Sequence, residues 1–259
     1  GDFGAQAALT PGAPAELAHL AQNFNAMTRQ LARYDKELRA SHVAMAHELR
    51  SPLTAAMVRL QALIDGVFTA DRRQHGLIME QLSCLRRLID ELHLLSLAEA
   101  GQLSLDTKPC NPADLLRERL LWIRPQLDAA GMRAEIGVTE NTLLNIDPFR
   151  LGQVLTILLE NALRYAGSGC RIMLSARRCD EGYEISVQDS GPGVPPAFLP
   201  IMFERFTRGE ASRARHSGGS GLGLSIAQAI CQAHGGAIAA SLPPEGGLRM
   251  RILLPGPFS

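Results

Sequence analysis

The sequence predicts a protein of two parts: an α-helical hairpin that forms a dimeric four-helix bundle with a second copy, and a separate α/β domain. Three observations indicate this. Apolar residues recur every three or four positions in the first hundred residues, the composition changes at residues 108–112, and helical and strand-like runs alternate beyond that point. With 259 residues, of which 46% are hydrophobic, the chain is long enough for one or two domains with buried cores.

Long helices are expected in the first hundred residues. Apolar residues over 17–38 follow one helical face, and a second run over 49–63 has the same spacing but is shifted in phase by one residue. Asp65-Gly66 ends this pattern, and a third apolar stripe follows over 78–92. Because each helix carries only a narrow apolar stripe, the hairpin alone buries little surface. We therefore expect a homodimer in which two hairpins complete the bundle.

The α/β part is predicted to contain a largely antiparallel sheet, with glycine-rich loops between its elements. Helical patterns cover residues 112–130, 148–166 and 221–234, and strand-like runs cover 134–138, 171–176, 183–188, 237–241 and 248–254.

Composition excludes several classes of protein. The 26 Lys and Arg balance 26 Asp and Glu, so there is no charge footprint for nucleic acid. The only lysines, Lys36 and Lys108, lie far from any glycine-rich loop, which excludes a Walker A site. The five cysteines lack metal-ligand spacing, which indicates reduced thiols and a cytosolic compartment. No segment has the roughly 18–20 apolar residues of a membrane span, so the fragment is expected to be soluble.

His47 is the first candidate functional residue. On a helix it lies about 160° from the apolar seam of residues 49–63, so its ring is predicted to face solvent. An exposed neutral imidazole is a competent nucleophile near pH 7. The carboxylate of Glu48 can orient the ring through one N–H. Taken alone, an exposed histidine on a helix is more often inert.

A second group of polar residues lies near the ends of two predicted elements, a helix and a strand. Asp147-Pro148 is a good start for a helix, near whose end Asn161 and Arg164 share a face. An amide oxygen such as that of Asn161 can bind Mg²⁺. Asp189 ends a predicted strand and can accept a hydrogen bond from an exocyclic amine such as that of adenine. Each of these features is common in proteins without a shared function.

A glycine-rich segment, residues 218–225, opens the last predicted helix. Its backbone N–H groups and the helix dipole can bind phosphate without a lysine. The preceding residues 207–217 hold four charged side chains and little to bury, which predicts a mobile lid.

Together, these motifs resemble the sensor histidine kinases of two-component signalling, and the resemblance covers nearly the whole chain. The fold that it implies for the second part is the GHKL-type (Bergerat) α/β sandwich, which binds ATP. The segments resemble the family's H, N, G1, F and G2 boxes at residues 47–53, 158–165, 189–193, 203–206 and 219–224 respectively.

The resemblance implies a role for each matching residue. His47 would accept a phosphoryl group, Glu48 would be its acid/base partner, and Ser51 would take part in dephosphorylating the partner protein. Asn161 would hold Mg²⁺. The residues expected to bind ATP are Asn161, Arg164, Tyr165, Asp189, Gly191, Gly193, Phe206, Arg208, Gly219, Gly221, Leu222 and Gly223.

The same resemblance implies an organisation and partners. Residues 1–40 would be the C-terminal part of a HAMP signal-relay module with a linker helix, 41–106 the dimerisation and histidine-phosphotransfer hairpin, and 107–259 the catalytic domain. The expected partners are a second copy and the receiver domain of a response regulator. The fragment would be the cytoplasmic part of a bacterial inner-membrane protein.

Three positions depart from the family pattern. Ile157 stands where the family has an asparagine and related ATPases have a glutamate that activates water. Arg164 replaces a lysine and keeps its charge. Ser51 replaces a threonine or asparagine but can still orient water. The missing asparagine leaves a second hypothesis open, a dimeric nucleotide-binding scaffold without catalysis.

Overall fold

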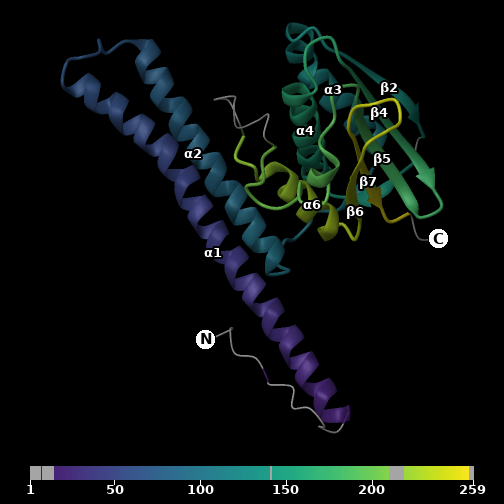
Figure 1. The fold of residues 1–259 in the computed structure, drawn as a ribbon. Coiled ribbons are helices and arrows are strands. Elements are labelled where there is room, and N and C mark those ends of the chain that lie inside the picture. The colour runs from purple at the N-terminus through teal and green to yellow at the C-terminus, as the bar shows by residue number, and fades with distance from the viewer. Residues whose placement is uncertain (1–6, 8–14, 141, 210–218, 257–259) are drawn as a thin grey trace. The chain divides into compact units, whose positions relative to one another are not determined.

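The structure is a computed structural model that describes residues 7, 15–140, 142–209 and 219–256 (Figure 1). Its contacts divide the chain into two compact units, residues 1–85 and 86–259, and the division falls inside the second helix. The domain boundaries expected after residues 40 and 106 remain predictions.

The first unit contains α1 and the first half of α2, and the two helices form the predicted helical hairpin. Helix α1 (Ala15–Ile64) is one continuous helix of 50 residues, which passes through the shift in apolar phase and past Pro52. It is followed by α2 (Arg72–Glu99). Gly66, with φ of +71°, allows the turn between them, and Arg59 Nη1 donates a hydrogen bond of 3.4 Å to Gln74 Oε1. The predicted hairpin is therefore confirmed. No described helix has the length and apolar content to cross a bilayer.

Most of the apolar seam of α1 is uncovered in a single chain. Every large apolar residue of the seam over 17–38 is exposed, from 42% at Leu31 to 66% at Leu20, and Leu53 and Leu60 of the second run are also exposed. A patch of this length needs a partner surface to leave water. It supports the homodimer expected from the sequence, which remains a proposal.

The second unit contains the predicted α/β domain. Its five-stranded sheet has the order β2-β4-β5-β7-β6, in which only β2 and β4 are parallel. The prediction of a largely antiparallel sheet is confirmed. A small antiparallel pair, β1 with β3, was not predicted. The elements are β1 (Lys108–Cys110), α3 (Pro112–Ala129), β2 (Arg133–Thr139), β3 (Leu144–Ile146), α4 (Pro148–Tyr165), β4 (Arg171–Cys179), β5 (Gly182–Asp189), the 3-10 turn η1 (Pro196–Phe198), α6 (Gly223–Ala233), β6 (Ala237–Ser241) and β7 (Arg249–Leu254).

Helices α3, α4 and α6 cover one face of the sheet (Figure 1). Alternate residues of the strands point to this face, and Leu174, Ile185 and Ile252 on three neighbouring strands are fully buried there. Leu155 and Leu159 of α4 are equally buried. This core fixes α4 and α6, the two helices that carry predicted binding residues.

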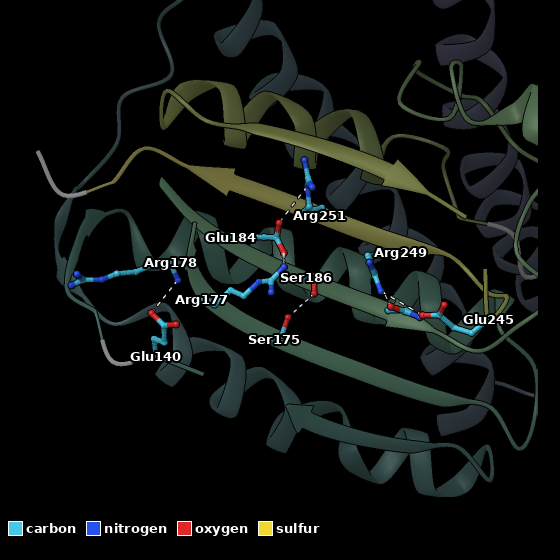
Figure 2. Close-up of polar contacts among 10 residues, drawn as sticks. Glu140, Ser175, Arg177, Arg178, Glu184, Ser186, Glu245, Arg249 and Arg251 are labelled. Atoms are coloured by element: carbon cyan, nitrogen blue, oxygen red, sulfur yellow. Dashed lines mark hydrogen bonds and ion pairs between the residues drawn. The ribbon is translucent and has the colours of Figure 1, made fainter. Parts of the chain in front are cut away.

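The other face of the sheet is polar (Figure 2). Glu184 is only 8% exposed, although none of the described helices covers this face. Arg177 lies 3.2 Å from one of its carboxylate oxygens and Arg251 lies 3.5 Å from the other. Beside them, the hydroxyls of Ser175 and Ser186 are 2.7 Å apart and hydrogen-bonded. These paired groups let the sheet face water without a second apolar layer.

Asp147 caps α4 as the sequence predicts, and it also joins distant segments. Its Oδ1 accepts from the N–H of Arg150 and its Oδ2 from the N–H of Asp106, each at 3.0 Å. Its own N–H donates to Nε2 of His234, also at 3.0 Å. Burial by itself would raise the pKa of Asp147, but the backbone hydrogen bonds outweigh it and the pKa is lowered.

We expect Asp147→Asn to lower the free energy of unfolding of the second unit by about 1–2 kcal/mol at pH 7, because the amide cannot accept from both N–H groups. The pKa of Asp147 is lower in the folded chain than in the unfolded chain, so the carboxylate stabilises the fold at pH values above its unfolded pKa. This contribution is lost as the pH falls through the pKa of the folded chain. The gap between wild type and variant should therefore close below about pH 4.

Urea unfolding between pH 3 and 7 measures this gap. Asp128→Asn, which removes an exposed carboxylate from α3, is the matched control and should stay near wild type. A gap that is constant across this pH range would contradict the role given to the Asp147 carboxylate.

Candidate functional site

The predicted acceptor residues lie on α1, in the first unit. His47 is exposed, as the helical phase predicts, and Ser51 is exposed one turn later. Glu48 is half-buried. The imidazole is thus open to an approaching group in the single chain.

One face of α4 contacts the glycine-rich loop in the second unit. Ile157, Asn161 and Arg164 follow each other at helical spacing, and all three are half-buried. A Cβ on Gly223 would lie 3.2 Å from Cγ2 of Ile157, and a Cβ on Gly219 would collide with the guanidinium of Arg164. These two contacts bracket Asn161, so its amide lies on the helix face that meets the loop.

Asp189, at the end of β5, is held by backbone N–H groups. Its Oδ1 accepts from Gly191 at 2.8 Å and from Leu248 at 3.4 Å. Burial is the largest effect on this carboxyl and raises its pKa, while the two hydrogen bonds act in the opposite direction. Since both bonds end on Oδ1, the carboxylate is fixed in orientation and Oδ2 can serve another donor.

Two glycines allow this turn to form. A Cβ on Gly191 would stand 2.6 Å from the Cα of Ala166, so the turn after β5 packs directly against the end of α4, beside Tyr165. Gly247, with φ of +83°, leaves no room for a Cβ beside the carbonyl of Asp189. Neither Gly247 nor the Leu248 N–H was identified from the sequence, because both lie almost 60 residues from Asp189.

Phe206 and Gly221 cross at short range, and we call this contact the 206–221 crossing. The N–H of Phe206 donates to the carbonyl of Gly221 at 3.0 Å. Phe206 has φ of +59° and Gly221 has φ of +74°, and a Cβ on Gly221 would lie 2.8 Å from the Cα of Phe206. The crossing joins the ends of the segment expected to form a lid. From residue 210 to 218 that predicted lid lies outside the described residues.

The glycine-rich loop leads directly into α6. The Ser220 hydroxyl accepts from the N–H of Leu222 at 3.2 Å, and the side chain of Leu222 is fully buried. The whole residue is buried, its N–H is taken by Ser220 and its carbonyl accepts from Ile226, so Leu222 supports the loop and exposes no group to a ligand. The first N–H groups of α6, which begins at Gly223, lack helical partners and favour an anion.

Other predicted binding residues lie on the same segments. Gly193 has φ of +69° and packs against Gly247, Arg208 is half-buried, and Tyr165 is 41% exposed. The structure thus brings the α4 face, the Asp189 turn and the glycine-rich loop together in one unit. Sequence reasoning did not single out Ser220, whose small hydroxyl side chain carries no periodic signal.

The protein atoms available to bind Mg²⁺ are sufficient only when phosphate fills other coordination positions of the ion. Among the described residues there is no group of three or more His, Cys, Asp or Glu able to hold a metal ion. Asn161 offers one amide oxygen. Mg²⁺ usually takes one or two protein ligands and fills its other positions with phosphate and water, so a single amide is compatible with it.

Two families match this chain. Residues 44–101 match the His Kinase A (phospho-acceptor) domain, and residues 146–257 match the family described as histidine kinase-, DNA gyrase B-, and HSP90-like ATPase. The first contains His47, and the second contains Asn161, Asp189 and the glycine-rich loop.

Curated relatives match over almost all of the chain. It is 35% identical over 98% of its length to the signal transduction histidine-protein kinase BaeS of Escherichia coli, covering 54% of that protein. It is 34% identical over 93% of its length to the signal transduction histidine-protein kinase AfsQ2 of Streptomyces coelicolor, covering 47% of that protein. The chain therefore spans about half the length of these relatives.

Solved structures show the same fold. The histidine kinase AdeS of Acinetobacter baumannii aligns with a TM-score of 0.68 at 29% identity, covering 81% of this chain and 97% of that one. The mycobacterial sensor histidine kinase MprB aligns with a TM-score of 0.52 at 30% identity, covering 57% of this chain and 98% of that one.

The 206–221 crossing predicts an unequal response to two glycine substitutions. Gly221→Ala should destabilise the second unit by about 2–4 kcal/mol, because it adds a clash with Phe206 to the cost of a positive φ. Gly169→Ala is the control. Gly169 has φ of +78° with nothing within 4 Å of a Cβ, so only the backbone cost of about 1 kcal/mol should appear. Equal shifts in thermal unfolding would refute the crowded crossing.

Proposed function

Because the chain belongs to the sensor histidine kinases of two-component systems, we propose that it transfers the γ-phosphoryl group of ATP to its own His47. One observation carries the proposal: the α4 face, the Asp189 turn and the glycine-rich loop converge in the second unit, and the first unit exposes a histidine. The second unit thus offers a site for the phosphoryl donor, and the first unit offers a phosphoryl acceptor.

The nucleotide is proposed to bind by its two ends. Oδ2 of Asp189 accepts from the exocyclic amine of adenine, since Oδ1 is already occupied by two backbone N–H groups. The phosphates lie at the N-terminus of α6, where the N–H groups of Gly219, Gly221 and Gly223 and the helix dipole favour negative charge. Arg164, against Gly219, adds a guanidinium that suits phosphate geometry.

Asn161 is the proposed protein ligand of Mg²⁺, which when bound neutralises charge on the phosphates. Ile157 offers neither a metal ligand nor a base. Its apolar side chain packs on Gly223 and cannot activate water. Direct hydrolysis of ATP is therefore disfavoured relative to transfer to a histidine.

At the acceptor, a neutral ring nitrogen of His47 attacks the γ-phosphorus, a P–N bond forms, and the bond from that phosphorus to the bridging oxygen breaks to release ADP. The ring loses its other N–H proton, for which Glu48 is the proposed base. The protein contributes mainly positioning and charge neutralisation, because phosphoryl transfer needs little covalent help.

The finer assignments follow the family. We propose a homodimer, transfer of the phosphoryl group to an aspartate of a response regulator, and an orienting role for Ser51 toward water in the reverse dephosphorylation. We also propose that residues 1–40 belong to a HAMP module, 41–106 to the phosphotransfer hairpin and 107–259 to the catalytic domain of a longer inner-membrane protein. The family matches at residues 44–101 and 146–257 support the second and third segments, and relatives about twice as long as this chain support a longer protein.

His47→Gln should abolish labelling of the chain by γ-labelled ATP, lowering it by at least about a hundredfold, because glutamine offers no nucleophilic ring nitrogen. Nucleotide binding should persist. His42→Gln, at another exposed position of α1, is the control and should label normally.

The label should be acid-labile and alkali-stable, as expected for a phosphoramidate. Labelling that survives in His47→Gln would identify another acceptor. A wild-type chain that binds ATP without any such label would instead favour the non-catalytic scaffold.

Asn161→Asp should weaken binding of Mg²⁺–ATP about tenfold, because the new carboxylate places a negative charge beside the phosphates. Labelling should fall with the affinity. Asn145→Asp makes the same change at an exposed position of β3 and should leave binding intact. Calorimetric titration with and without Mg²⁺ separates the metal's contribution. Unchanged binding in Asn161→Asp would remove this residue from the metal site.

A further inference from the structure

Two glutamates of α2 contact residues beside the 206–221 crossing. The Ser220 hydroxyl donates a hydrogen bond of 3.0 Å to Oε2 of Glu91, and Arg205 forms an ion pair with Glu99. All four residues belong to the second unit, residues 86–259. The phosphate-binding role given to this region above does not use either glutamate.

The two contacts reach both sides of the crossing. Arg205 directly precedes Phe206, and Ser220 directly precedes Gly221. Glu91 and Glu99 are eight residues apart on α2, which places them about 12 Å apart along the helix axis. One helix therefore holds both chain segments where they cross.

We propose that Glu91 is an autoinhibitory ligand of the glycine-rich loop, whose carboxylate competes with the nucleotide phosphates for the Ser220 hydroxyl. The inference rests on the proposed nucleotide site at residues 219–223 and adds a regulator to it. Binding of nucleotide and the α2 contact exclude each other.

The hydrogen-bond capacity of Ser220 carries the argument. A hydroxyl has one proton to donate, and in this structure Ser220 donates it to Glu91 while its oxygen accepts from the Leu222 N–H. The hydroxyl therefore has no donor left for a phosphate oxygen. A phosphate at residues 219–223 can gain that bond only after Glu91 has released it.

Charge opposes joint occupancy as well. Glu91 is half-buried, and burial raises the pKa of its carboxyl, although the Ser220 hydrogen bond and Arg87 act against this rise. Glu160, next to Asn161 on α4, adds negative charge and contributes to the rise. A nucleotide polyphosphate beside these two carboxylates would add like charge to a partly desolvated place.

The contact of Glu91 with Ser220 is stronger than the contact of Glu99 with Arg205. The side chain of Glu99 is 65% exposed in its pair with Arg205, and exposed ion pairs contribute little. By linkage, any partner or signal that moves Glu91 away from Ser220 raises nucleotide affinity, and nucleotide binding weakens the contact by the same factor.

The test measures binding of the non-hydrolysable β,γ-imido analogue of ATP, with Mg²⁺, to the full 259-residue chain by calorimetry. Glu91→Ala should bind about five- to tenfold more tightly than wild type, because it removes a charged hydrogen-bond competitor. Glu91→Gln should bind about threefold more tightly, because it removes the charge but can still accept from Ser220. Asp90→Asn removes a neighbouring exposed carboxylate and should match wild type.

A second measurement assigns the effect to Ser220. In a Ser220→Ala background, Glu91→Ala should improve affinity by less than half of its effect in wild type, because the contested hydroxyl is absent. An equal improvement in both backgrounds would overturn competition for this hydroxyl.

Affinity that is unchanged or weaker in both Glu91 variants, while wild type binds the analogue, would overturn the inference and leave the proposed nucleotide site standing. Failure of the proposed function has a different signature, in which neither wild type nor any Glu91 variant binds. Binding by Glu91→Ala alone would support the inference most strongly.

Discussion

The second unit depends on backbone segments that approach each other too closely for a side chain. Gly191 meets the end of α4, Gly221 meets Phe206, and Gly247 meets the carbonyl of Asp189. At each contact a Cβ would overlap main-chain atoms, which cannot rotate away as a side chain can. These contacts fix the Asp189 turn against α4 and hold the 206–221 crossing, while the side chains of Ile157 and Arg164 join α4 to the glycine-rich loop.

Helix α4 connects this arrangement to the core. Its buried side carries Leu155 and Leu159, and its opposite side carries Asn161 and Arg164 toward the glycine-rich loop. The start of α4 is held by Asp147, which accepts hydrogen bonds from its own helix and from Asp106 and donates one to His234. Stability and ligand geometry are therefore coupled, because a shift of α4 in the core moves both the proposed Mg²⁺ ligand, Asn161, and the proposed phosphate contact, Arg164.

The contacts of Ser220 illustrate how one small side chain can connect binding with regulation. Its hydroxyl oxygen accepts a hydrogen bond from the Leu222 N–H within the loop, and its single proton is donated to Glu91. A nucleotide that needs the same proton must displace the carboxylate, so the state of α2 and the affinity of the loop are linked by hydrogen-bond capacity. The proposed phosphoryl transfer likewise requires α1 and the second unit to act together, since His47 and the nucleotide residues lie in different units.

Much of this protein was predictable from the sequence, because the relevant signals are local. Helical spacing of apolar residues predicted α1, α2 and α4, alternation predicted most strands, and Asp147-Pro148 predicted a capped helix start. Helical phase alone predicted that His47 faces solvent. The order of five short motifs indicated the family without any three-dimensional information.

Only the tertiary structure decided which distant groups meet. The β1–β3 pair is three residues long on each side and has no periodicity to detect. Leu248 donates to a carboxylate 59 positions away, His234 accepts from a residue 87 away, and Ser220 reaches Glu91 across 129 positions. Such contacts depend on how the sheet and helices pack, and packing is a property of the whole folded chain that no local pattern encodes.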